Sequence, residues 1–86
     1  MTITSDVLAA HLGDEAVLLD LSAKRYYRLN ESAAVAFRAL EEGEGRDGAI
    51  RRLVATFEVD ESDAASAVDA LLADLAARGL VAQSAR

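Results

Sequence analysis

The chain contains no cysteine, proline or tryptophan, and only one histidine, two tyrosines and two phenylalanines among its 86 residues. Without cysteine it can form neither a disulfide scaffold nor a thiolate metal site. A single histidine leaves too few ligands for the usual zinc sites and too few partners for histidine-based nucleophilic catalysis. We therefore expect no metal, no cofactor and no enzymatic activity, and a core built from aliphatic side chains.

Long apolar runs and an excess of basic residues are also missing. No run approaches the roughly 20 residues that span a bilayer, and the N-terminal residues lack the basic and apolar regions of a signal peptide. These features predict a soluble cytoplasmic domain that does not act at a membrane. The net charge of −6 is unfavourable for nucleic-acid binding, which depends on Lys and Arg neutralising phosphates. Three of the nine basic residues, Lys24, Arg25 and Arg28, nevertheless fall close together, either as an anion-binding patch or as a solvated strand face.

The length of 86 residues is sufficient for one small domain. We expect a single domain over residues 1–86, with frayed ends at 1–6 and 83–86. A turn signal at Gly13 and Asp14 separates two apolar segments, and a short connection precedes a third segment. The three predicted strands are residues 7–12, 16–21 and 25–29. Because short connections join antiparallel neighbours, they predict a three-stranded β-meander.

The last predicted strand, residues 25–29, alternates between two faces, as a half-buried strand does. Tyr27 and Leu29 share one face and are expected in the core, whereas Tyr26 and Arg28 share the exposed face. Directly after this strand, Asn30 has a side chain that can cap the first backbone N–H groups of a helix. The apolar residues that follow at helical spacing are Ala33, Ala36, Phe37 and Leu40.

A second helix is predicted after the loop 41–46, whose two glycines interrupt the first helical pattern. Asp47 is a residue type that caps helices, so we expect this helix to begin there. Its predicted buried face consists of Ile50, Leu53, Val54 and Phe57. The carboxylates of the loop, which belong to Glu41, Glu42 and Glu44, are expected to form a charged surface and not a metal site.

The third predicted helix begins after Asp60 as its cap and extends to about Arg78, with Gly79 as the residue that ends it. Residues 80–81 are expected to close back onto the core. Its apolar stripe covers roughly 140° of the circumference, whereas one-sided packing needs about 100°. Either one flank of the stripe faces a groove, or the alanines only reflect helix propensity. The stripe consists of Ala64, Ala65, Val68, Leu71, Leu72, Leu75 and Ala76.

The predicted fold class is therefore α+β, with an N-terminal three-stranded antiparallel β-meander followed by three helices. The helical part has the lengths of a winged-helix module, but its strands precede the helices, whereas a DNA-binding wing usually follows them. A winged-helix transcription factor also needs a basic recognition helix. The third helix instead carries Asp63, Asp69 and Asp74, and only Arg78 at its end. We therefore expect no nucleic-acid partner.

Several segments in a fixed order resemble the PqqD-like family. They are Val17-Leu-Leu-Asp-Leu, Arg25-Tyr-Tyr-Arg-Leu-Asn30 before an Ala-rich helix, Phe57-Glu-Val-Asp60 and Leu72-Ala-Asp-Leu-Ala-Ala-Arg-Gly-Leu-Val81. Each element alone is degenerate, but their order and spacing are fairly specific and cover residues 7–82. Domains of this family are RiPP recognition elements, which bind the leader segment of a ribosomally made precursor peptide. A short free-standing chain of this kind looks most like the leader-binding proteins of lasso-peptide pathways, which work with a separate leader peptidase and a lactam-forming cyclase.

The resemblance implies that the leader adds as an antiparallel strand beside residues 25–29, with its other side against the third helix. Small Ala65 and Ala76 would leave room for a large leader side chain. Arg25 and Arg28 could pair with leader carboxylates, and Asp69 with a leader Lys or Arg. Exposed pairs of this kind contribute under about 1 kcal/mol, so apolar anchors should dominate the affinity. The peptide-binding residues that the resemblance implies are Arg25, Tyr26, Tyr27, Arg28, Leu29, Ala65, Val68, Asp69, Leu72, Leu75 and Ala76.

Other interpretations of the same residues stay open. Tyr27, Leu29, Val68 and Leu75 can all belong to the core instead of a ligand site. The chain could also serve as a peptide-binding chaperone in a quinone-cofactor pathway or another RiPP pathway. A third possibility is a dimerisation module without a ligand, because an exposed edge strand can also pair with a second copy.

Overall fold

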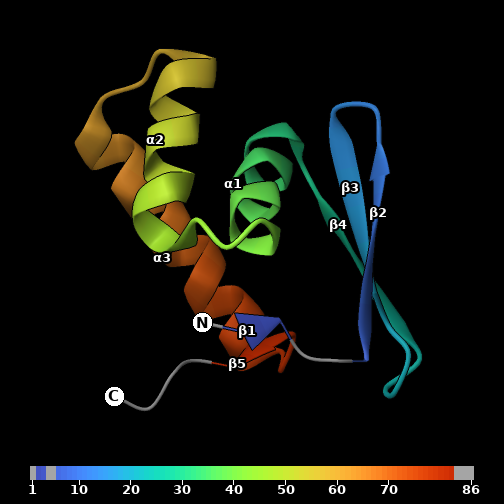
Figure 1. The fold of residues 1–86 in the computed structure, drawn as a ribbon. Helices are drawn as coiled ribbons and strands as arrows, with labels where there is room; N and C mark the ends of the chain where they lie inside the picture. Colours follow the sequence, from blue (N-terminus) through green and yellow to red (C-terminus); the bar gives the residue numbers. More distant parts are fainter. Residues whose placement is uncertain (1, 4–5, 83–86) are drawn as a thin grey trace.

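The computed structural model describes residues 2–3 and 6–82, which form a three-stranded sheet with three helices on one of its sides (Figure 1). The prediction of an α+β meander followed by three helices is confirmed. The sheet has the antiparallel order β2-β3-β4, and two short strands, β1 and β5, form a separate antiparallel pair. The elements are β1 (Thr2–Ile3), β2 (Val7–Leu12), β3 (Glu15–Asp20), β4 (Arg25–Leu29), α1 (Glu31–Glu41), α2 (Gly45–Phe57), α3 (Glu61–Ala77) and β5 (Val81–Ala82).

The register of the sheet separates an inner face from an outer face. Leu18 lies opposite Tyr27, and Ala16 lies opposite Leu29, in rows that face the helices. Ala16 and Leu18 are fully buried and Leu29 is nearly so, while Tyr27 is half-buried and packs against the same cluster. Tyr26, one position along, is 66% exposed. The predicted alternation of β4 is therefore confirmed.

The turn between β3 and β4 is held by a side chain of β3. The backbone N–H of Ala23 donates to Asp20 Oδ1, three residues back, at 3.1 Å, a local bond from backbone to side chain that holds the turn. Lys24 follows in the left-handed region, with φ of 58°. Strand β3 ends at Asp20, one residue before the predicted end, and Leu21 is 56% exposed.

Helix α1 begins as predicted, because the backbone N–H of Ala33 donates to Asn30 Oδ1 at 2.9 Å. The predicted start of α2 at Asp47 is wrong, since the helix already begins at Gly45. Gly45 has a φ of 71°, which lets the chain turn directly from the loop into the helix without a side-chain cap. Asp47 instead lies in the first turn, where its carboxylate is near the positive end of the helix dipole.

Helix α3 follows Asp60 and ends as predicted, with Arg78 as its C-cap and Gly79 at a φ of 74°. The backbone N–H of Leu80 donates to the carbonyl of Leu75 at 2.9 Å, and that of Gly79 donates to Ala76 at 3.1 Å. These two bonds form a Schellman motif, which satisfies carbonyls at the helix end. The motif turns the chain back, so that Leu80 and Val81 are buried, as expected.

The pairing of β1 with β5 was not predicted from the sequence. Ile3 lies opposite Val81, which ties the N-terminal strand to the segment after α3 (Figure 1). Residues 2–3 are therefore strand and not frayed ends, whereas residues 1, 4–5 and 83–86 lie outside the described part of the chain. Asp6 lies in a turn, and its backbone carbonyl accepts a hydrogen bond from the backbone N–H of Leu21 at 2.9 Å.

The core has two adjoining clusters, and α3 contributes to both. Phe37 is fully buried in the first cluster, where α1 meets the sheet, the end of α3 and Leu80. The second cluster joins the three helices around Ile50, Leu53 and Val68. The apolar stripe predicted for α3 is the face that packs in these clusters, with Ala65, Leu71 and Ala76 only partly buried. Among the described helices, none has the length and hydropathy needed to cross a membrane.

Candidate functional site

Strand β4 (Arg25–Leu29) is an edge of the sheet. It pairs with β3 on one side, and no described strand pairs with its other side. The N–H and C=O groups of a free edge can accept an added strand. The inward side chains of Tyr27 and Leu29 fix the strand on the core, while Tyr26 and Arg28 stay exposed. The backbone of β4 is therefore held rigidly with one edge open.

Beside the end of β4 lies a pocket of about 320 Å³, where the chain enters α1 and faces α3. A second pocket of about 310 Å³ shares three of its lining residues and continues toward Phe57 and Val59. Together they make one groove along a flank of α3, which we call the α3 groove. Its walls are mostly small or apolar side chains. The lining of the first pocket is Asn30, Ser32, Ala33, Ala36, Leu53, Ala67, Ala70, Leu71 and Asp74.

A contact between Arg78 and Tyr27 joins the end of α3 to β4. The guanidinium carbon of Arg78 lies 4.6 Å from the centroid of the Tyr27 ring, a cation–π geometry. Arg78 Nε also donates to Asp74 Oδ1 at 3.1 Å, one helical turn back. The carboxylate of Asp74 and the Tyr27 hydroxyl raise the pKa of Arg78. This chain of contacts holds the inward tyrosine of β4 and an acidic wall residue of the α3 groove together.

Five residues of α3 that were predicted to bind peptide lie in the core or against it, and not at the α3 groove. Val68, Leu72 and Leu75 are 0%, 7% and 1% exposed and belong to the core clusters. Ala65 and Ala76 are partly buried against the same clusters. None of these five residues lines either pocket of the α3 groove. They support the groove from within the core, so their direct contact with a peptide stays a prediction.

Asp69, also predicted to bind peptide, is paired within the protein. Arg46 of α2 donates from Nε to Asp69 Oδ1 at 2.6 Å and from a terminal nitrogen to Oδ2 at 3.0 Å. This bidentate pair lowers the pKa of Asp69 and raises that of Arg46. Asp69 is therefore already neutralised by α2, and it does not line the α3 groove.

The α3 groove and Asp69 lie on opposite flanks of the apolar stripe of α3. At about 100° per residue, Ala65, Asp69 and Ala76 lie on one side of Val68, and Ala67, Leu71 and Asp74 on the other. The residues on the second side line the α3 groove. Leu71, a member of the predicted apolar stripe, is partly buried and packs against both core clusters. The wall residues that sequence reasoning missed are Ala67, Ala70 and Asp74. Periodicity alone carries no signal for them, because it does not tell which flank of a stripe faces β4.

The remaining polar clusters link elements of the fold. His11 Nε2 lies 2.7 Å from Glu41 Oε1, which ties β2 to the end of α1. Arg52 donates to the carboxylates of Glu42 and Glu44, which holds the loop after α1 against α2 and lowers the pKa of Glu44. In the described residues, no group of three or more His, Asp or Glu side chains could hold a metal ion.

Comparisons with known proteins agree with this architecture. The chain matches the family "Coenzyme PQQ synthesis protein D (PqqD)" over residues 15–81. It is similar to the solved structure of TbiB1 in complex with the TbiA(beta) leader peptide, with 29% identity, a TM-score of 0.91 and full coverage of both chains. It is also similar to a lasso peptide synthetase B1 complexed with its leader peptide, with 26% identity, a TM-score of 0.84 and coverage of 94% of this chain and 95% of that one. Among curated protein sequences, none matches. The chain therefore belongs to the PqqD family of RiPP recognition elements, as its sequence resemblance predicted.

Proposed function

We propose that this chain is a non-catalytic adaptor that binds the leader segment of a ribosomally synthesised precursor peptide. The observation that carries the proposal is the free edge of β4 beside the apolar α3 groove. Two structures with the same fold over at least 94% of this chain are complexes with leader peptides. Membership of the PqqD family also supports a binding role without catalysis.

In the proposed complex, the leader lies antiparallel to β4 and forms backbone hydrogen bonds with Arg25–Leu29. Because strand side chains alternate, every second leader side chain would point toward the α3 groove. The groove offers Ala67, Ala70 and Leu71 as contacts, and the small alanines leave room for a large apolar side chain. Such apolar anchors would supply most of the affinity.

Charged contacts would act at the rim of the site. The guanidinium of Arg28 is exposed and lies 2.9 Å from Glu15, and Arg25 has no ion pair within the described residues. Either could pair with a leader carboxylate. Asp74 is an acidic wall residue of the α3 groove, and its carboxylate also pairs with Arg78. Because exposed ion pairs are weak, these groups would set the register and orientation of the leader more than its affinity.

The enzymes that receive the leader are part of the proposal. By similarity to the lasso-peptide B1 protein, we infer a leader peptidase and a lactam-forming cyclase acting in the cytoplasm. A role as chaperone in a quinone-cofactor pathway is the alternative, since the family takes its name from that pathway. The precursor that binds would distinguish the two pathways.

Fluorescence polarisation with a labelled leader peptide, taken from the precursor gene beside the gene for this chain, tests the proposal. Ala70→Glu places a carboxylate in the α3 groove, and Ala73→Glu makes the same change at an exposed position of the same helix that lines neither pocket of the groove. We expect saturable binding that Ala70→Glu weakens at least about tenfold and Ala73→Glu leaves unchanged. A folded wild-type chain that does not bind the leader contradicts the proposed function.

The free β4 edge also allows pairing between two copies of the chain. Sedimentation of the peptide-free chain measures this directly. A monomer supports the adaptor, whereas a stable dimer that leader peptide does not dissociate would favour a dimerisation module.

A further inference from the structure

Both pockets of the α3 groove have a carboxylate in their wall, and no basic side chain of the described residues lines either of them. Asp74 lines the pocket beside the end of β4 and pairs with Arg78. Asp63 lines the pocket that continues toward Val59; it is exposed and has no ion pair within the described residues. The end of the α3 groove at Asp63 therefore carries a negative charge that no described side chain neutralises.

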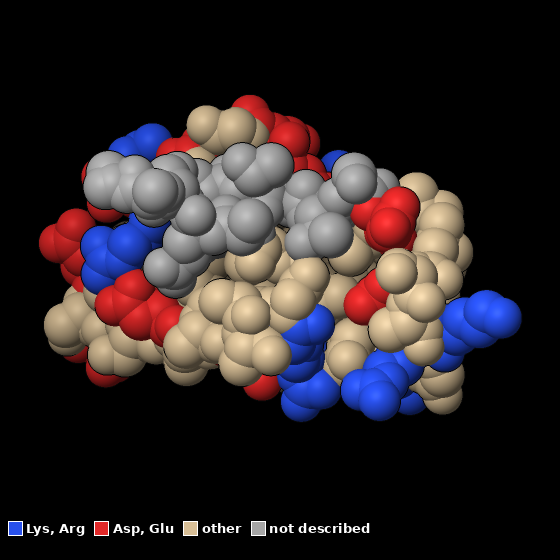
Figure 2. Space-filling model, turned by 90° about the horizontal axis from the view of Figure 1, so that it is seen from below, with Lys and Arg blue, Asp and Glu red and all other residues tan. Residues whose placement is uncertain are grey.

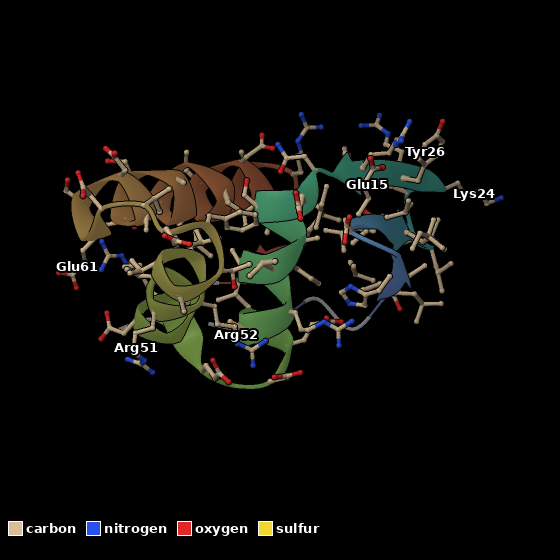
Figure 3. All side chains as sticks on the ribbon, turned by 90° about the horizontal axis from the view of Figure 1, so that it is seen from above. Glu15, Lys24, Tyr26, Arg51, Arg52 and Glu61 are labelled. Atoms are coloured by element: carbon tan, nitrogen blue, oxygen red, sulfur yellow. The ribbon has the colours of Figure 1, made fainter. Side chains whose placement is uncertain are left out.

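The chain around Asp63 adds to this negative charge. Residues 58–63 contain four carboxylates and no basic residue. The positive end of the α3 dipole is equivalent to about half an elementary charge, so it offsets only a small part of theirs. Arg51 of α2 also lies at this end of the molecule, but it lines a separate pocket together with Glu61 (Figure 3). The site therefore has an acidic end where the groove meets the start of α3.

The opposite end of the site, where β4 begins, is basic. Lys24 and Arg25 are exposed and form no ion pair within the described residues, whereas Arg28 lies 2.9 Å from Glu15. Lys and Arg gather at the sheet end of the face seen from below (Figure 2). Lys24 and Glu61 lie at opposite ends of the molecule (Figure 3). The proposed peptide site thus has a basic end at the β3–β4 turn and an acidic end at the start of α3.

The two charged ends belong to one continuous path along the protein. Strand β4 ends at Leu29, and Asn30, the next residue, lines the first pocket of the α3 groove. Ser32 lines both pockets, and the second pocket extends to Asp63. The 5 residues of β4 span on the order of 15 Å, which exceeds the screening length of about 8 Å at physiological salt. The basic end and the acidic end therefore act on a bound peptide separately.

Backbone pairing alone does not fix the direction or the register of an added strand. The hydrogen bonds along β4 do not depend on the sequence of the peptide. A shift by two residues also leaves every peptide side chain on its original face. A leader antiparallel to β4 runs from Leu29 toward Arg25, so its residues before the paired segment lie along the α3 groove. Its residues after that segment lie at Lys24 and Arg25.

We infer that the site selects leaders by their charge polarity, with Lys or Arg before the segment that pairs with β4 and Asp or Glu after it. The inference rests on the proposed function and specifies the class of leader that the same site accepts. Asp63 attracts the basic side chains, and Lys24 and Arg25 attract the acidic ones. A leader of the opposite polarity, or one bound in the reverse direction, brings like charges together at both ends, and such repulsion rejects wrong partners.

The first test compares two labelled peptides by fluorescence polarisation at low salt. One is the leader encoded beside the gene for this chain. In the other, the inverted leader, each Lys or Arg before the paired segment is replaced by Glu, and each Asp or Glu after it by Lys. Protection of the leader amides from hydrogen exchange in the complex defines the paired segment. We expect the wild-type chain to bind the inverted leader at least about tenfold more weakly, and raised salt to narrow the difference.

A charge-inverted protein provides the second test. Asp63→Lys raises the charge at one end of the site and Arg25→Glu lowers it equally at the other, so a variant with both keeps the net charge of −6. Asp14→Lys combined with Arg38→Glu is the matched control, because both residues are exposed and line a pocket that is separate from the α3 groove. We expect the first variant to prefer the inverted leader and the control to keep the preference of the wild type.

The outcomes separate the charge polarity from the proposed function. If the wild-type chain binds neither leader, the proposed function fails. If it binds the native and the inverted leader equally, leader binding stands and the charge polarity is overturned. A native leader that binds but lacks basic residues before the paired segment, or acidic residues after it, also overturns the polarity. The comparison of the two leaders needs no substitution in the protein, so it decides the matter even where a variant does not fold.

Discussion

Arg78, the C-cap of α3, lies with its guanidinium 4.6 Å from the centroid of the Tyr27 ring on β4. The contact joins two elements that are far apart in the sequence, at the place where the free strand edge meets the α3 groove. Asp74 holds the same guanidinium from one helical turn back. The distance between the strand edge and the helix flank is therefore constrained by side chains as well as by the core.

Replacing Arg78 should weaken leader binding without unfolding the protein. Arg78→Ala removes the contact with Tyr27 and leaves Asp74 without its partner, and we expect leader affinity to fall about two- to fivefold, as for a modest exposed cation–π contact. Arg78→Lys keeps the charge but not the planar group, so it should restore only part of the affinity. Fluorescence polarisation measures both. Arg51→Ala serves as control, because Arg51 is an exposed arginine of α2 at the end of the molecule away from Tyr26 of β4 (Figure 3). An equal effect of Arg51→Ala would refute a specific role for Arg78.

Phe37 should be the most sensitive core position. It is fully buried and connects α1 with Leu18, Leu75 and Leu80. Phe37→Ala leaves a large cavity and should lower the free energy of unfolding by about 3–5 kcal/mol, measured by urea denaturation. Phe57→Ala provides the matched comparison, because Phe57 is only half-buried at the end of α2. This substitution should lower the free energy of unfolding clearly less than Phe37→Ala does. Equal losses would mean that the core is not centred on Phe37.

The pair between Asp69 and Arg46 should give a small stability term that depends on pH. The guanidinium of Arg46 lowers the pKa of Asp69 in the folded chain. The stabilisation is therefore fully present at pH values above the pKa of Asp69 in the unfolded chain, which is about 4. It is lost as the pH falls through the pKa of Asp69 in the folded chain. We expect Asp69→Asn to lower the melting temperature at neutral pH and to match the wild type in strong acid.

Two controls make the Asp69 experiment specific. Asp14→Asn changes an exposed carboxylate in the turn after β2 that has no ion pair within the described residues, and the melting temperature of this variant should differ little from the wild type at neutral pH. Raised salt should reduce the effect of Asp69→Asn, because the pair is exposed. The leader affinity of Asp69→Asn should also be unchanged. A clear loss of affinity would instead support the flank of α3 that the sequence resemblance implied.

Local signals in the sequence were sufficient for most of the fold. The cap at Asn30, the turn at Gly13 and the helix end at Gly79 each depend on neighbouring residues only, and the structure has all three. The start of α2 was misplaced because Gly45 permits a helix entry that needs no capping side chain. The β1–β5 pair was missed because strands of two residues carry no periodic pattern.

The candidate site could be predicted from the sequence only in part, because one of its two walls depends on how the helices pack. Alternation along Arg25–Leu29 separates the inward residues from the exposed ones without any knowledge of the rest of the fold. The stripe on α3 is also readable from spacing, but the flank that faces β4 depends on how α3 crosses α1 and α2. That crossing places Asp69 against Arg46 and leaves Leu71 beside the end of β4. Only the tertiary arrangement decides between the two flanks.

Lys24→Gly should stabilise the β3–β4 turn. Glycine adopts the left-handed conformation at Lys24 without steric cost, so the substitution should raise the free energy of unfolding by up to about 1 kcal/mol in urea denaturation. Lys24→Asn, which tolerates this conformation and is also uncharged, should behave in the same way. A variant that is less stable would show that the lysine side chain is needed by the turn itself.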